Sequence, residues 1–224
     1  MKELLTASCP VAVWIITALE ALFVILALRG WFRKKESLYL LTALVAFGLF
    51  YDALILSLGA VLPGGPTLAA LSRMRYVAHG ALIPLLFPIC AYALDFNKTW
   101  ETIVWVLTGV LIAAGVAEGF ATALELREAA GLVRYASGDA TPGWAKAVSG
   151  VLSYGAVVPL ILAGIVVWIK QKTPLLFLAG FLMFAFSALG PATGNFDLIF
   201  YISMYGEVCM ALCFLLYARR RAKE

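Results

Sequence analysis

Two carboxylic acids, Asp52 and Glu207, lie deep inside long apolar stretches of this chain, where an acid is expensive to bury. An ionised carboxylate in hydrocarbon costs at least about 2.5–3.5 kcal/mol, so such groups face a bundle interior, pair with a partner or stay protonated. When two carboxyl groups share a dry cavity, one of them holds a proton. That acid can protonate an apolar ligand, and its ionised partner can take a proton back. Asp52 and Glu207 are therefore the candidate catalytic residues.

Three further ionisable residues fall inside apolar stretches. Glu20 in the first stretch and Glu118 in the outer half of the fourth are equally suited to a structural hydrogen bond and to a functional role. His79 is expected near the outer end of the third stretch, next to Arg75 and Tyr76, as a hydrogen-bonded interfacial residue that can contact a substrate.

Aromatic residues surround both acids. Tyr51 precedes Asp52, and residues at helical spacing from Glu207 share its face. Aromatic rings attract positive charge without capturing a carbocation readily, although the same spacing is typical of ordinary helix packing. The candidate substrate-binding residues are Tyr51, His79, Phe200, Tyr201, Ser203 and Tyr205.

The composition predicts that membrane-spanning helices position these residues. Of the 224 residues, 63% are hydrophobic and 13% charged, and the mean hydropathy is +0.96. These values exclude a soluble globule, and they give poor support to a disordered chain and to nucleic-acid binding. A spanning helix takes about 20 residues. We therefore expect a single integral membrane domain over residues 1–224.

Apolar stretches bounded by charges or by Gly, Pro and Asn predict seven helices, an all-α bundle. The expected spans are 10–28, 38–62, 76–94, 102–124, 147–169, 174–189 and 196–218. The longest polar connection, 125–146, is expected to carry a short interfacial helix at 126–135.

The basic residues predict the orientation. Eleven of the 17 lysines and arginines fall on the C-terminal side of the predicted membrane. The other six are Lys2, Arg73, Arg75, Arg127, Arg134 and Lys146. The positive-inside rule then places the C-terminus in the cytoplasm and the N-terminus outside.

Metal chemistry has little support in the sequence. A single histidine and four scattered cysteines cannot form a zinc or iron cluster of the usual spacing. Cys209 and Cys213 stand four residues apart on one predicted helix, too far apart for an unstrained disulfide. Hydrolase and nucleotide-binding motifs do not occur.

Two segments resemble the membrane-bound terpene cyclases of meroterpenoid pathways. The basic turn 33–37 leads into an apolar run ending in Phe50-Tyr51-Asp52, similar to that family's second helix, which carries an aromatic residue followed by an acid, usually Trp-Glu. Glu207, about three turns before the tail Arg219-Arg220-Arg221, resembles the family's last helix, which carries an aspartate there. The 155-residue interval between the acids also agrees. Here the two acid types are exchanged and tyrosine replaces tryptophan.

The resemblance implies a metal-independent, cofactor-free isomerase or lyase that cyclises a prenylated, lipid-like substrate in meroterpenoid biosynthesis. One acid protonates an epoxide or a terminal alkene, rings close through carbocations, and a base removes the final proton. The exchange of acid types changes the reach by one methylene at each site, so which acid starts the reaction stays open.

Two other classes remain as alternatives. A proton-coupled transporter could use Glu20, Asp52, Glu118 and Glu207 as a relay. A rhodopsin-like receptor is suggested by Arg75-Tyr76 and Pro84-Leu85-Leu86, which resemble the third helix of microbial rhodopsins. The last predicted helix has no lysine, which rules out a covalently attached retinal.

Overall fold

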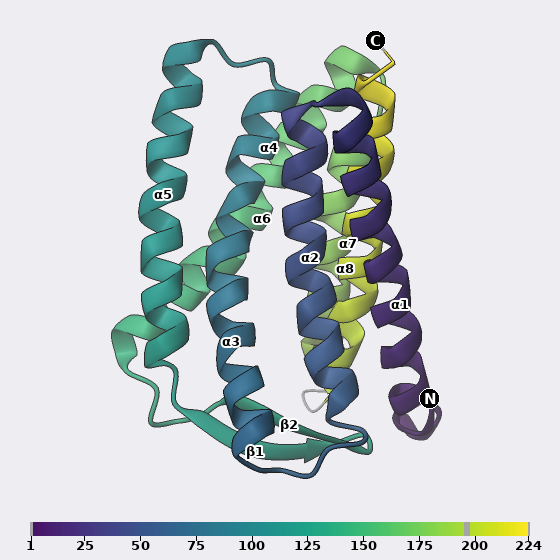
Figure 1. The fold of residues 1–224 in the computed structure, drawn as a ribbon, viewed down its shortest axis with the longest axis vertical. Helices are drawn as coiled ribbons and strands as arrows, with labels where there is room; N and C mark the ends of the chain where they lie inside the picture. Colours follow the sequence, from purple (N-terminus) through teal and green to yellow (C-terminus); the bar gives the residue numbers. More distant parts are fainter. Residues whose placement is uncertain (1, 195–197, 224) are drawn as a thin grey trace.

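The computed structural model describes residues 2–194 and 198–223, and in this part of the chain seven helical spans are long and apolar enough to cross a membrane. Figure 1 shows them as one bundle, with the chain termini at opposite ends. The predicted seven-helix bundle is confirmed; its orientation across a membrane stays a prediction. The helices are α1 (Lys2–Lys34), α2 (Ser37–Leu58), α3 (Pro66–Leu82), α4 (Leu86–Ala93), α5 (Lys98–Ala121), α6 (Gly143–Gln171), α7 (Leu175–Ala192) and α8 (Ile199–Arg221).

The third span, which joins α3 and α4 through a 3₁₀ turn at Ile83–Leu85, begins ten residues before the predicted start at 76. The apolar pattern is interrupted there by Ser72, Arg73 and Arg75, so it does not predict the first turns of the helix. The fold accommodates Arg73 because its Nη1 donates to the carbonyl oxygens of Gly119 and Phe120, both at 3.2 Å, and of Thr122. Basic groups at a helix C-terminus satisfy its free carbonyls, here those of α5.

Most other bounds differ from the predicted ones by a few residues. The second span ends at Leu58 rather than 62, and α1 extends beyond both predicted ends. The predicted start of the last span, residue 196, lies outside the described residues.

The predicted interfacial helix at 126–135 is wrong. This segment is a hairpin of β1 (Leu124–Ala129) and β2 (Leu132–Ser137), paired antiparallel. Its two-residue turn, Ala130 and Gly131, has φ of +54° and +75°, as in the turns that match the twist of a hairpin. Apolar and charged residues alternate at the start of Leu124–Ala129, which fits a strand. The sequence Glu128-Ala129-Ala130, in contrast, has residues that favour a helix.

The hairpin lies across one end of the bundle (Figure 1), which we call the hairpin end. The Val133 N–H donates to the Gly59 carbonyl at 2.9 Å, and a Cβ atom at Gly59 would collide with the Val133 carbonyl. A glycine is therefore required after α2 for this close approach. The hairpin is anchored to the bundle through backbone contact.

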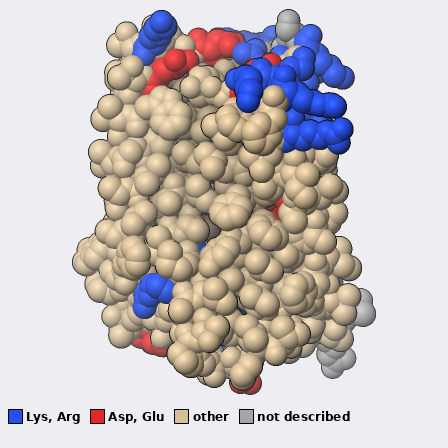
Figure 2. Space-filling view, in the orientation of Figure 1, with Lys and Arg blue, Asp and Glu red and all other residues tan. Residues whose placement is uncertain are grey.

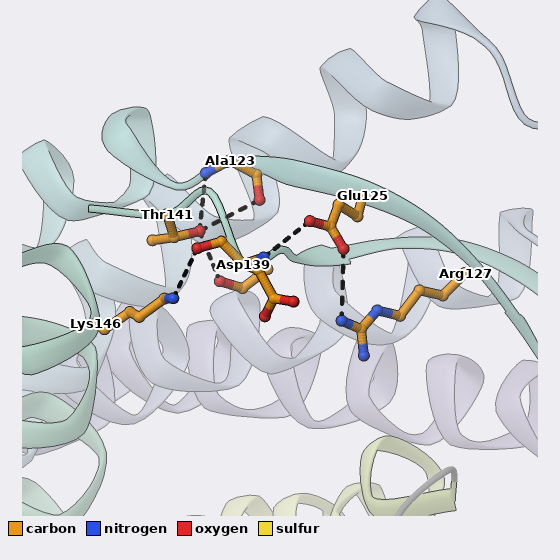
Figure 3. Close-up of polar contacts among 7 residues, drawn as sticks. Ala123, Glu125, Arg127, Asp139, Thr141 and Lys146 are labelled. Carbon is orange, nitrogen blue, oxygen red and sulfur yellow. Dashed lines mark hydrogen bonds and ion pairs between the residues drawn. The ribbon is translucent and has the colours of Figure 1, made fainter. Parts of the chain in front are cut away.

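The segment after the hairpin is closed by polar contacts (Figure 3). Thr141 Oγ1 accepts from the Ala123 N–H at 3.1 Å, and Glu125 Oε1 accepts from the Asp139 N–H at 2.8 Å. Lys146 Nζ donates to the Asp139 carbonyl at 2.9 Å. These bonds fix the return of the chain from β2 into α6.

Glycines bring α3 and α5 into close contact. A Cβ atom at Gly80 would collide with the backbone of Gly115, and the reverse also holds. Gly119 meets the backbone at Val77 in the same way. Small residues that let two helix backbones touch are typical of membrane bundles. This contact sets the position of α3.

Buried apolar residues form two clusters. The larger fills the half of the bundle near the C-terminus and includes Phe23, Leu41, Leu86, Leu160 and Phe214. The smaller lies toward the hairpin end, where it joins α1, α2, β2 and α8; its members are Cys9, Val13, Ile16, Ala53, Leu56, Leu132, Tyr201 and Met204.

The outer surface is apolar along the middle of the bundle. Large hydrophobic side chains are exposed on several helices, among them Val11, Ile25, Val106, Val110 and Leu162. In Figure 2 lysine and arginine gather at the C-terminal end, and the middle of the visible face is almost free of charge. This distribution suits contact with lipid acyl chains.

Candidate active site

A cavity of about 180 Å³ lies inside the bundle toward the hairpin end. It is lined from α2, α3, β2 and α8 by Asp52, Leu56, Arg75, Tyr76, His79, Arg134, Phe200, Ser203 and Glu207. The two candidate catalytic acids, 155 residues apart in sequence, thus face one space. Asp52 lies six residues before the end of α2, so the cavity is nearer the hairpin end than the bundle middle.

Asp52 is paired with a cation. Its Oδ1 lies 3.4 Å from Arg75 Nε, and the two side chains are 19% and 10% exposed. The Arg75 guanidinium also lies over the ring of Tyr76, 5.0 Å from its centroid. Asp52 and Arg75 therefore carry opposite formal charges at ion-pair distance on neighbouring helices.

Glu207, on α8, has a different environment in the same cavity. The residue is 7% exposed, and its Oε2 atom is buried with no hydrogen-bond partner among the described residues. A buried carboxylate oxygen without a donor is costly, whereas a neutral carboxylic acid is much cheaper to bury. A proton on Glu207 would remove this cost.

A second guanidinium, that of Arg134, enters the cavity from β2. Arg134 alternates along the strand with Leu132 and Ala136, which are both buried, so it faces the bundle. Its guanidinium carbon lies 4.1 Å from the centroid of the Phe200 ring. Burial, together with the neighbouring Arg75 guanidinium, lowers the pKa of Arg134 from its ordinary value.

The other predicted substrate-binding residues divide into two groups. His79, Phe200 and Ser203 line the cavity with the two acids. Tyr51, Tyr201 and Tyr205 are outside its lining: the Tyr51 hydroxyl donates to the Leu71 carbonyl at 3.3 Å, and the Tyr201 and Tyr205 hydroxyls are 2.6 Å apart.

Two residues expected at the outer edge of the membrane lie inside the bundle. His79 is near the middle of the span Pro66–Ala93, because α3 begins earlier than predicted. Arg75, expected in an outside loop, is a buried residue of the same helix. Both predicted positions are wrong for the same reason: a charged residue predicts the end of an apolar stretch, whereas Arg75 lies inside α3.

Glu20 and Glu118 are buried in different settings. Glu118 Oε1 accepts from Thr122 Oγ1 at 3.0 Å on α5, outside the cavity. Glu20 on α1 is fully buried, and neither of its carboxyl oxygens has a hydrogen-bond partner in the described parts of the chain. It lies within electrostatic range of Asp52 and Glu207.

Sequence reasoning missed four lining residues as parts of the site: Leu56, Arg75, Tyr76 and Arg134. Arg75 stands 23 residues after Asp52, and no local pattern shows that two neighbouring helices bring them together. For Arg134 a signal exists: it alternates with Leu132 and Ala136, the pattern of a strand with one buried face.

Within residues 2–194 and 198–223 no group of histidine, cysteine and acidic residues has a geometry that could hold a metal ion. The four cysteines are free thiols, as expected for Cys209 and Cys213. In comparisons with known proteins, no protein-family model and no curated protein sequence matched the chain.

Proposed function

We propose that this protein is an integral membrane enzyme that protonates an epoxide or terminal alkene of a prenylated, lipid-like substrate and isomerises or cyclises it through a carbocation. The observation that carries the proposal is the contrast between the two acids of one cavity. Asp52 is ion-paired with Arg75, whereas Glu207 has a buried oxygen without a partner. Opposite environments for two neighbouring acids assign one as acid and the other as base.

In the proposed reaction the Glu207 carboxylic acid transfers its proton to the substrate. With an epoxide, the oxygen takes the proton and a C–O bond breaks; with an alkene, the π electrons form a C–H bond. Either step leaves a tertiary carbocation, which the π electrons of a second alkene attack to form a C–C bond. Asp52 removes the final C–H proton and returns it to Glu207, so the product is an isomer of the substrate.

The rest of the lining fits this chemistry. Phe200 and Tyr76 both line the cavity. Each ring has a guanidinium over one face, which leaves the other face for contact with a carbocation. The cavity is smaller than the roughly 300–1,000 Å³ of pockets for drug-sized ligands, so it can hold the reacting part of a prenylated molecule while the remaining chain extends between helices toward lipid. The resemblance of the second and last helices to membrane-bound terpene cyclases supports the same reaction class.

The test is product formation in membranes. Membranes containing the protein are supplied with farnesylated or geranylgeranylated aromatic acceptors, with and without a terminal epoxide, and extracts are searched for isomers of unchanged mass. Because general acid and base groups each contribute about 10²–10⁴-fold, Asp52→Asn and Glu207→Gln should each lower the rate by at least about 100-fold. Glu118→Gln is the matched control, since its carboxyl is buried outside the cavity. Equal rates in Glu207→Gln and wild type would refute the assignment.

A proton-coupled transporter is the second candidate, because Glu20 is a third buried acid near the pair. Beyond Glu20, however, the half of the bundle near the C-terminus is filled by the larger apolar cluster. The buried polar residues described there are Thr42, Thr108 and Thr173, which makes a poor proton path across the bundle. Uptake driven by a proton gradient in vesicles, with no isomeric product, would favour the transporter and contradict the enzyme.

A further inference from the structure

With Glu207 protonated, as in the proposed function, the lining of the cavity carries one more positive charge than negative charges. Arg75 is neutralised by Asp52 at 3.4 Å. Arg134 forms no hydrogen bond or ion pair with any described residue, and its Nε atom is buried without a partner. With Glu207 neutral, the lining therefore holds one guanidinium without a counter-ion.

A free guanidinium at this place is costly in two ways. Partial burial removes water from the guanidinium, and no anion compensates for that loss. It also opposes the proposed reaction, since a carbocation forming in the same cavity would be repelled by it. Both costs disappear if a bound molecule brings one negative charge to Arg134.

We infer that the cavity binds the carboxylate of an amphipathic, isoprenoid-type carboxylic acid, with Arg134 as its counter-ion; this identifies the substrate class of the proposed enzyme and rests on that proposal. The planar fork of a guanidinium matches a carboxylate with two parallel hydrogen bonds. A single unbalanced cation calls for a monoanion. A diphosphate would leave excess negative charge in this lining.

The hairpin holds Arg134 ready for such a ligand. The Phe200 ring supports one face of the guanidinium at 4.1 Å, and the flanking Leu132 and Ala136 pack into the bundle. The backbone bond from Val133 to Gly59 fixes the strand itself. The fork is thus held in place before binding, which reduces the entropy lost when the ligand is ordered.

The test measures binding without turnover. Purified protein in detergent is titrated by equilibrium dialysis with a farnesyl-chain carboxylic acid and, in parallel, with its methyl ester, which has nearly the same shape but no charge. Wild type should bind the acid at least about 30-fold more tightly, the range expected for a buried charge pair. Arg134→Gln should lose this preference, and Arg134→Lys should keep part of it, since lysine retains the charge without the fork.

Arg127→Gln is the matched control. Arg127 stands directly opposite Arg134 in the hairpin register, but it is half exposed, is paired with Glu125 at 3.6 Å and does not line the cavity. Its replacement should leave the preference unchanged. Equal affinity of the wild-type protein for the acid and the ester would overturn the inference. This comparison uses only the wild-type protein, so it does not depend on whether a variant folds.

Failure of the inference is distinguishable from failure of the proposed function. Turnover of neutral prenylated substrates, with equal binding of acid and ester, would refute the carboxylate site and leave the enzyme standing. A preference for the acid that depends on Arg134, in a protein that forms no isomeric product, would support the site and refute the cyclisation.

Discussion

The two halves of the bundle are built differently. In the C-terminal half, helices meet through a continuous apolar cluster, and the charged residues lie at the surface, as in the exposed pair of Arg221 and Asp95 at 2.6 Å. In the half toward the hairpin, charged side chains point inward and a cavity remains. One half is therefore a packed apolar core, whereas the other places charged groups around a cavity, an arrangement that we expect to contribute less to stability.

The largest effect on stability is expected from breaking the inward ion pair. Arg75→Gln leaves the Asp52 carboxylate, which is 19% exposed, without its partner; this should destabilise the fold by about 3 kcal/mol, the low end of the range for buried pairs. The measurement is denaturant unfolding in detergent micelles. Adding Asp52→Asn to this variant should recover part of the loss.

The exposed pair of the other half provides the control for this prediction. Asp95→Asn should cost no more than about 1 kcal/mol, because its side chain is 65% exposed and surface pairs contribute little. If Asp95→Asn proved as damaging as Arg75→Gln, the contrast between the two halves would be lost.

A smaller effect is expected from separating α3 from α5. Gly80→Ala places a Cβ atom against the backbone of Gly115, and overpacking of this kind costs up to about 3 kcal/mol. It should also slow product formation, since α3 carries three of the residues that line the cavity. Gly109→Ala on α5 is the control: nothing lies within 4 Å of its added Cβ, so stability should hold or rise. A neutral result for Gly80→Ala would mean that the helix contact is adjustable.

The smallest effect, and one of opposite sign, is expected at Glu20. Glu20→Leu removes a buried carboxyl group without a partner and should stabilise the protein by about 1–2 kcal/mol. In the proposed enzyme it should leave product formation within a few-fold of wild type, because Glu20 does not line the cavity. Loss of all activity in Glu20→Leu would instead indicate that Glu20 supplies protons to Glu207. Unfolding curves measure the expected gain in stability, and product yields measure the expected activity.

Much of the architecture could be predicted from the residue order. Each span is a long apolar run, and a helix is the economical way to satisfy backbone groups in hydrocarbon. The errors fall where polar residues lie inside the fold. The charge of Arg75 predicts the start of the third span just after it. In the structure Arg75 lies inside that span and pairs with Asp52. Arg134 falls in the predicted interfacial helix at 126–135, although its alternation with Leu132 and Ala136 fits the strand that the structure shows.

The sequence by itself determined that the chain forms seven apolar helices and that Asp52 and Glu207 lie within two of them, since hydrophobicity acts through the immediate surroundings of each residue. Only the tertiary structure decided which partner each acid has. Arg75 reaches Asp52 from a neighbouring helix, Glu207 is left with an unpaired oxygen, and Arg134 arrives from a hairpin across the end of the bundle. The physical reason is that electrostatic environment depends on distance in space, and these residues are far apart along the chain.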